Sequence, residues 1–375
     1  MIRQFAEHQR VWFAFIISAL IVGVPVQIGA AQSTGFSLVQ TAEYDLGFDC
    51  PVTSALDAAG TTLWVLMDNC GRSGYSLHAY HVADGTALAM DDYADALQSL
   101  VGTNNYIDPF STPMGFTPAG DLSIHYTNFD DSSTSTLLIP LASGGEATTE
   151  TSASYNALLA EYSDYPDFSV YSPNHTRVVA AGETSFHVLD VQTETEIVEI
   201  PVEGSTDSAA ASFSADGERL EVVHYQSMDS VSDHSATLLI YSLPDGALLK
   251  QYSLPSSPVW ISPDEAYAAV SLWSNNVGDV NELVVINLET GLTSPAVSLN
   301  EDPAPVATCL NNGHDVRDVN FMTSGRFSFP DLHWLTDSSS LIVPLSYNGE
   351  GAAGSGSLCI FNYSRLRTYR VEDAG

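Results

Sequence analysis

The sequence predicts an all-β chain that folds as a β-propeller of about six four-stranded blades, because one local pattern occurs six times. Each occurrence has a turn of small or acidic residues followed by an apolar, often β-branched run, which is typical of a strand that leaves a tight turn. The clearest examples are "ISPDEAYAAV" (261–270), "FSADGERLEVV" (213–223) and "YSPNHTRVVAA" (171–181), and looser ones lie at 116–126, 56–66 and 335–345. The six turns are anchored at Asp57, Thr117, Ser172, Ser214, Ser262 and Thr336.

A second strand-like run follows each of these turns. In order, the second runs are "SLHAYHVADG" (76–85), "STLLIPLASG" (135–144), "SFHVLDVQTE" (185–194), "ATLLIYSLPDG" (236–246), "ELVVINLETG" (282–291) and "SLCIFNYSRL" (357–366). A weaker run such as "LLKQYSL" (248–254) comes next. One unit therefore contains four antiparallel strands, which is the make-up of a propeller blade.

Radial stacking of the units explains why predicted strands such as "LVVI" (283–286) are almost continuously apolar. A single blade cannot bury both faces of its sheet, and its two neighbours cover them. A β-sandwich with as many strands is the alternative, but the equal phase of turn and strand in all six units favours the propeller. The segment 35–46 is a spare strand-like run. We expect it to join the last blade and close the ring, and a seventh, irregular blade is the alternative.

The Ser-Pro-Asp turn at 262–264 and the exit Asn-Leu-Glu-Thr-Gly at 287–291 resemble the repeats of WD-repeat-like and TolB-type β-propellers. The likeness is strongest in the units anchored at Ser214 and Ser262, and it is degenerate in several others. The six units have no Gly-His and Trp-Asp pairs at the places where true WD repeats carry them, which makes the TolB type the closer relative. The resemblance implies a propeller with binding sites on the faces of a disc, and it implies no single chemistry.

The N-terminal segment 1–31 has the features of a signal peptide that is cleaved before Gln32. Arg3 and Arg10 give a positive charge before an apolar run over 11–24, and small residues follow this run before Gln32. An uncleaved membrane anchor is the alternative, since this stretch could nearly span a bilayer. We therefore expect an exported chain, secreted or periplasmic, whose residues 32–375 form a single propeller domain with a long insertion at 299–330.

Four cysteines in an exported chain suggest two disulfides. Cys50 and Cys70 are equally distant from Gly60, so a hairpin that turns there without a bulge places them opposite each other, within disulfide range. Cys309 and Cys359 pair by elimination. Four buried free thiols are the alternative.

The net charge of −35 results from missing cations, because the chain has 46 acidic residues but only 11 Lys and Arg, with Lys250 the sole lysine. Such a surface repels phosphate backbones and anionic lipid headgroups, which excludes nucleic acid as a partner. Adaptation to a saline exterior and loose binding of cations both fit the charge. We expect a monomer that binds a protein or a glycan, with no membrane contact once the signal peptide is removed.

Three connectors break the repeat rhythm. The segments 91–101 and 154–164 each place apolar residues on one helical face, and we expect two short helices that pack on the blades or, alternatively, bind a ligand. The longest break is 299–330, and a loop of this length in a compact domain is usually functional or disordered. Its residues His314, Asp315, Arg317 and Asp318 form the candidate binding loop.

The sequence has no recognisable catalytic set. His78 and His81 lie three apart in a strand and point to opposite faces, so they cannot share a metal. The glycine-rich segment 348–358 has neither the following helix nor the lysine of a phosphate-binding loop, and we interpret it as a flexible loop between strands. No cofactor is predicted, and no motif supports a divalent cation. We expect a binding or scaffold module, and a metal-dependent, lactonase-like propeller hydrolase with its site at the channel mouth is the alternative.

Basic residues cluster near the C-terminus, where they either neutralise local acidic groups or form a dock for an acidic partner. They are Arg317, Arg326, Arg365, Arg367 and Arg370.

Overall fold

The described part of the chain consists almost entirely of antiparallel β-strands. The computed structural model describes residues 35–47, 50–68, 74–88, 97, 100, 105–107, 114–117, 119–128, 133–142, 146–151, 169–174, 176–206, 209–225, 235–255, 259–273, 280–299, 315–321, 332–352 and 358–373. Within these ranges no helix has the length and hydropathy of a membrane span.

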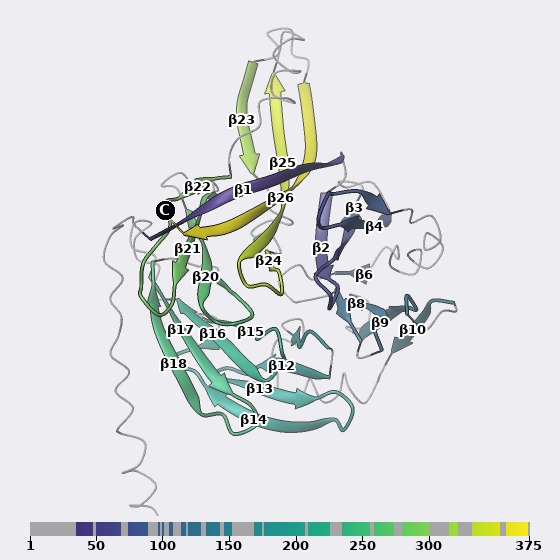
Figure 1. The fold of residues 1–375 in the computed structure, drawn as a ribbon. Coiled ribbons are helices and arrows are strands. Elements are labelled where there is room, and N and C mark those ends of the chain that lie inside the picture. The colour runs from purple at the N-terminus through teal and green to yellow at the C-terminus, as the bar shows by residue number, and fades with distance from the viewer. Residues whose placement is uncertain are drawn as a thin grey trace, which may run out of the picture.

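The strands form six antiparallel sheets arranged around a common axis, as the blades of a β-propeller (Figure 1). Blade 1 contains β2 (Cys50–Leu56), β3 (Thr62–Asp68), β4 (Tyr75–His81) and β5 (Ala87–Leu88), and blade 2 contains β6 (Asn105–Tyr106), β7 (Met114–Phe116), β8 (Leu122–Asn128), β9 (Ser133–Ile139) and β10 (Thr148–Thr151). Blade 3 contains β11 (Ser169–Tyr171), β12 (Arg177–Ala181), β13 (Ser185–Asp190) and β14 (Thr195–Pro201), and blade 4 contains β15 (Ala209–Phe213), β16 (Arg219–Tyr225), β17 (Ala236–Ser242) and β18 (Leu248–Leu254). Blade 5 contains β19 (Val259–Ile261), β20 (Tyr267–Trp273), β21 (Val280–Asn287) and β22 (Val297–Ser298), and blade 6 contains β23 (Asp315–Phe321), β24 (His333–Trp334), β25 (Ser340–Ala352), β26 (Leu358–Asp373) and β1 (Phe36–Gly47). The predicted six-bladed fold is confirmed, with two strands in the first-strand position of blades 2 and 6.

The first strand of the chain closes the ring. β1 pairs with β26 antiparallel, from Phe36 opposite Asp373 to Gly47 opposite Ser364. The expectation that the spare segment 35–46 joins the last blade is therefore confirmed. Closure in this way covers the outer edge of most of β26, which would otherwise be open to pairing.

Strand β12 shows why the apolar runs do not alternate. Val178 and Ala180 are buried on one face of blade 3. Val179 and Ala181 are buried on the other face, in a cluster with Leu220 of blade 4. Because neighbouring blades cover both faces of the sheet, a strand inside a blade buries consecutive residues and not every second one.

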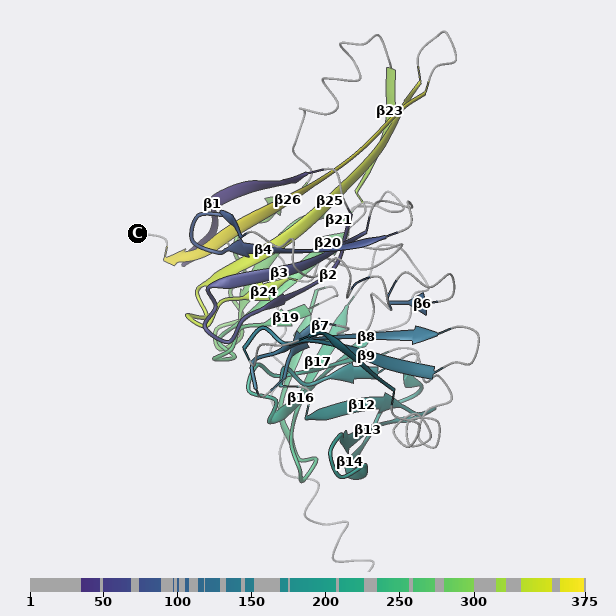
Figure 2. The same ribbon diagram turned by 90° about the vertical axis from the view of Figure 1, so that its right-hand side faces the viewer.

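Blade 6 extends beyond the other blades as a three-stranded projection (Figures 1 and 2). β25 and β26 have 13 and 16 residues, and their register continues without a shift to Ala352 opposite Leu358. β23 pairs with Tyr347–Ala352 of β25. We call β23, 347–352 and 358–363 the arm, and the remainder of the six blades the disc. The interpretation of 348–358 as a loop is wrong for 348–352, because these residues continue the ladder despite their two glycines.

The two predicted connector helices fall largely outside the described residues. Of 91–101 the structure describes Leu97 and Leu100, which are buried in the core between blades 1 and 2. Their burial favours the cap that packs on the blades over the binding helix. The segment 154–164 lies outside the described residues.

Candidate functional site

The first turn of blade 4 is held by a serine and an aspartate two residues apart. Ser214 Oγ accepts a hydrogen bond from the backbone N–H of Arg219 (3.0 Å) and donates one to Asp216 Oδ1 (2.6 Å). Asp216 Oδ1 also accepts the N–H of Glu218 (3.0 Å). The turn therefore satisfies its own backbone donors, which fixes its shape.

Blades 3 and 5 repeat this arrangement. Ser172 with Asn174, and Ser262 with Asp264, make the same contacts at 2.7–3.2 Å. All three serines are at most 3% exposed. The repeated sequence pattern thus corresponds to a hydrogen-bonded turn whose serine is buried.

The looser turns use other acceptors at the same place. Asp57 accepts the N–H of Thr61 (2.7 Å) in blade 1, and Asp337 accepts two backbone N–H groups at 2.9 Å in blade 6. Partial burial opposes ionisation of Asp57, but the hydrogen bonds from Thr61 and Thr62 outweigh it and hold the pKa of this carboxyl below its usual value.

Neighbouring first turns touch each other. In blades 5 and 6, the N–H of Asp264 donates to Ser338 Oγ at 3.1 Å. In blades 6 and 1, a Cβ added at Gly60 would lie 3.3 Å from Thr336 Oγ1, and Gly60 has φ +69°. The sequence therefore places a glycine where the turn is left-handed and the next blade is close.

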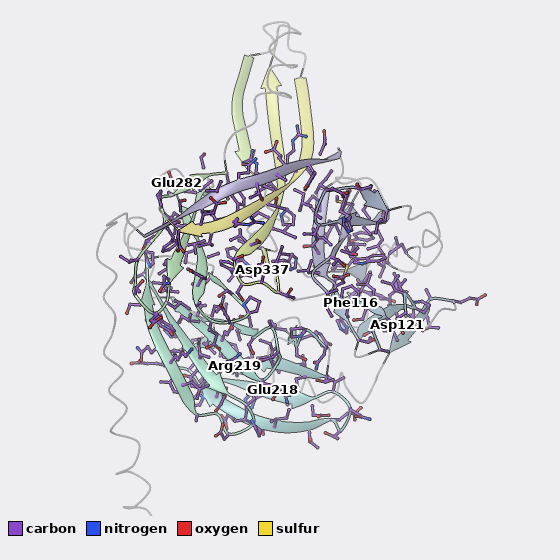
Figure 3. The ribbon with its side chains drawn as sticks, viewed as in Figure 1. Phe116, Asp121, Glu218, Arg219, Glu282 and Asp337 are labelled. Atoms are coloured by element: carbon purple, nitrogen blue, oxygen red, sulfur yellow. The ribbon has the colours of Figure 1, made fainter. Side chains whose placement is uncertain are left out.

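The contacts continue through blades 3, 4 and 5. The Arg177 guanidinium donates to the carbonyl of Gly217. Arg219 Nε and Glu265 Oε1 form an ion pair at 2.8 Å. The first turns of blades 3, 4, 5, 6 and 1 thus form one connected surface, which we call the first-turn face. Figure 3 shows Arg219 and Asp337 on it, near the axis of the ring.

Glu265 is the centre of an ionic network between blades 4 and 5. Its side chain is 5% exposed and pairs with Arg219 and with Lys250 Nζ (2.5 Å). Its φ of 57° is unusual for a residue with a side chain. The two cations compensate the cost of burying this carboxylate.

Glu221 lies buried near this network. It is 7% exposed and accepts a hydrogen bond from Ser212 Oγ at 3.3 Å. Burial, with a further contribution from the charge of Glu265, raises its pKa to about 8. The carboxyl is therefore mostly protonated at neutral pH.

Two side-chain contacts join neighbouring blades, one between the inner strands of blades 1 and 6 and one between β8 of blade 2 and β11 of blade 3. Ser54 of β2 and His333 of β24 form a hydrogen bond, with Oγ and Nε2 2.7 Å apart. Burial lowers the pKa of His333 to about 4, so its ring is neutral over most of the pH range. His125 stacks on Tyr171 with ring centroids 3.7 Å apart. Because Ser54 is 4% exposed, the Ser–His pair joins blades 1 and 6 and does not present a nucleophile to substrate.

The predicted binding loop lies on the arm. Asp315, Arg317 and Asp318 belong to β23, and Arg317 occupies a register shift in its pairing with β25. His314 lies outside the described residues. The backbone thus brings three of the four residues onto one edge strand, away from the first-turn face.

The expected facing of Cys50 and Cys70 is wrong in register. Cys50 is opposite Asp68, because the turn pairs Leu56 with Leu63, one residue off the expected register, and a bulge between Pro51 and Thr53 shifts the pairing by one residue more. Cys359 lies opposite Gly351 in the arm. Cys70 and Cys309 lie outside the described residues, so both disulfides stay predictions.

Acidic residues of β1 accompany two of the clustered arginines. Arg365 pairs with Asp45 at 2.9 Å, and Arg367, which is 3% exposed, pairs with Glu43 at 2.6 Å. Local neutralisation is therefore the role of these two residues. In the described ranges, no three His, Cys, Asp or Glu side chains come together as a metal site.

Sequence reasoning missed Glu221, Glu265 and their cations. One signal was available: Glu221 stands between Leu220 and Val222, within the apolar part of its strand. The sole lysine, Lys250, was a second signal, but its partner is 15 residues away in the next blade and follows only from the fold.

Comparisons with known proteins find similarity in structure but not in sequence. No model of a known protein family matches the chain, and no curated protein matches it by sequence. Among solved structures the chain is similar to hydrazine synthase from Kuenenia stuttgartiensis, with 14% identity and a TM-score of 0.40, over 86% of this chain and 80% of that chain.

Proposed function

We propose that the protein is an exported, TolB-type β-propeller that acts as a binding or scaffold module for a protein or glycan partner. The observation that supports this function is the first-turn face, where five neighbouring turns are in contact and fixed by their own hydrogen bonds. A surface whose loops are already ordered loses little conformational entropy when a partner binds.

The chemistry of this face indicates what it recognises. Asp216, Glu218, Asp264 and Asp337 are all exposed there. Their carboxylates favour a partner with basic or hydroxyl-rich groups, and binding to a basic partner weakens as salt rises. The signal peptide and the even number of cysteines favour an extracytoplasmic location.

The test is recovery of partners from the native exterior on the immobilised chain, at low and high salt. Glu218→Lys changes an exposed charge on the first-turn face. Glu282→Lys makes the same change near the N-terminal end of β21, away from that face (Figure 3). We expect a partner that is retained by wild type and Glu282→Lys and reduced about tenfold with Glu218→Lys. Recovery of no partner at any salt concentration contradicts the function, and equal loss with both variants contradicts the face.

A further inference from the structure

The two outer edges of the arm have opposite character. β23 forms one edge and carries Asp315, Arg317 and Asp318, with a register shift between Val316 and Asp318. Charged residues and bulges are the devices that protect edge strands from pairing with other chains. The other edge, which is the end of β26 in the arm, has neither device.

That second edge is the segment Leu358–Tyr363, "LCIFNY". Its inner side pairs with β25 in a register without shifts. β1 covers the outer side of β26 only from Ser364 onward, and no other described strand pairs with β26. A six-residue strand with no charge and no proline, which the described strands leave unpaired along one side, is a template for strand addition.

We propose that this edge pairs with the same edge of a second copy of the chain, antiparallel, to form a dimer with a continuous sheet. A register that places Ile360 opposite Phe361 of the partner subunit also places Leu358 opposite Tyr363 of the partner subunit. By two-fold symmetry each pair occurs twice, and aromatic residues opposite β-branched or aliphatic ones stabilise antiparallel pairs. The segment is thus complementary to itself.

The projection of the arm makes self-association compatible with a net charge of −35 per chain. Six residues of strand hold the discs apart by roughly 20 Å. This exceeds the screening length of about 8 Å at physiological ionic strength, so repulsion between the discs is weak there. The edge itself is uncharged. A dimer of this kind differs from the monomer expected from the sequence.

The size of the interface sets its strength. A stable interface uses roughly 20–30 residues on each side, whereas this edge offers six backbone positions and their neighbours. We therefore expect a weak dimer that forms at micromolar or higher concentration and is strengthened by salt.

The test is the mass of the full chain after export, measured by sedimentation from about 1 μM to about 500 μM at low and high salt. Ile360→Lys places a charge on the proposed edge, and Val319→Lys makes the same change on β23. Because either lysine reduces the net negative charge, a bulk effect strengthens association in both variants. The proposed interface predicts instead that Ile360→Lys weakens it about tenfold and Val319→Lys leaves it within about twofold.

Three results overturn the proposal: a wild-type monomer at every concentration and salt, equal weakening by both lysines, or stronger association with Ile360→Lys. Thermal unfolding of both variants confirms that the disc is intact. The outcome is independent of the proposed binding function, which concerns the first-turn face.

Discussion

The contact between blades 4 and 5, which we call the seam, and the closure of the ring at blade 6 both hold neighbouring β-strands together. They differ in how the chain connects the parts that meet. Blade 5 follows blade 4 directly, since β18 ends at Leu254 and β19 begins at Val259. At the closure, β1 meets β26 from the opposite end of the chain. The first seam is thus assisted by a short covalent link, whereas the closure depends on non-covalent contacts.

Both places bury an Arg–Glu pair, but the buried partner differs. At the seam the glutamate, Glu265, is the buried member, with Arg219 more exposed. At the closure the arginine, Arg367, is buried and Glu43 is more exposed. An arginine cannot be neutralised by deprotonation at ordinary pH, so loss of the Glu43 carboxylate leaves a buried charge without its partner.

The two places also respond to pH in opposite directions. Glu221 at the seam has a raised pKa, so the folded state retains a proton that the unfolded state loses, and stability falls as pH rises toward 8. His333, which contacts Ser54 near the closure, has a lowered pKa, so the unfolded state gains a proton first and stability falls as pH decreases from 6.5 toward 4. The two contributions oppose each other between pH 4.5 and pH 6.5, and above pH 6.5 only the loss from Glu221 remains.

The largest effect is expected from removal of β1, because the closure has no covalent substitute. Deletion of residues 36–47 removes buried Phe36, Leu38 and Leu46, each worth about 1.5–3 kcal/mol, so the loss is roughly 5 kcal/mol or more. Urea unfolding followed by tryptophan fluorescence measures it. Leu38→Ala should cost about 3 kcal/mol, and Val39→Ala, at a 37% exposed position, less than about 0.5 kcal/mol. An unchanged midpoint after the deletion contradicts the role of β1 as the closing strand.

A smaller effect is expected from Arg367→Met, at about 2–3 kcal/mol, because the side chain is 3% exposed and donates to Glu43 and to the carbonyl of Leu299. Arg365→Met, in the same strand but paired with the exposed Asp45, should cost less than about 1 kcal/mol. The free energy of unfolding in urea at pH 7 distinguishes them. Equal costs would show that burial of Arg367 adds nothing to the closure.

The number of blades and the closing strand could be predicted from the sequence because both depend on local patterns. Ser214 and Ser262 each form a hydrogen bond with an aspartate two residues later, so the residue types and their spacing predict the turn. The apolar run around Val284 indicates burial on both faces. Such features need no knowledge of the fold.

The rest depends on contacts between blades or on register. Lys250 and Glu265 meet only after blades 4 and 5 have stacked. The facing of Cys50 failed because the turn pairs Leu56 with Leu63 and not with Trp64, and a bulge then moves every pairing beyond it by one more residue. The arm was missed because glycines at 349 and 351 usually indicate a loop, and nothing local shows that a strand on each side holds them in a ladder.

The seam's pH dependence is tested by Glu221→Gln. Wild type should lose about 2 kcal/mol of stability between pH 6 and pH 8, since the unfolded carboxyl is ionised throughout this range while the folded one is largely protonated. The glutamine keeps a polar group beside Ser212 without a titration, so its stability should change far less. Glu218→Gln, at a 60% exposed side chain, is the control and should follow wild type. A wild-type profile that is flat from pH 6 to pH 8 contradicts the raised pKa.

The smallest effect is expected at the axis, from His333→Gln below pH 6.5. Between pH 6.5 and pH 5 wild type should lose about 1.5 kcal/mol through this histidine, because the unfolded state takes up a proton while the buried ring stays neutral. The glutamine variant can still bond to Ser54 and should lose less over this interval, although the lowered pKa values of Asp57 and Asp337 make both proteins acid-sensitive. The difference between the two profiles, measured by urea unfolding at each pH, isolates His333. If the profiles are parallel, the closure gains no pH dependence from the axis, and the opposite responses of seam and closure reduce to the single titration of Glu221.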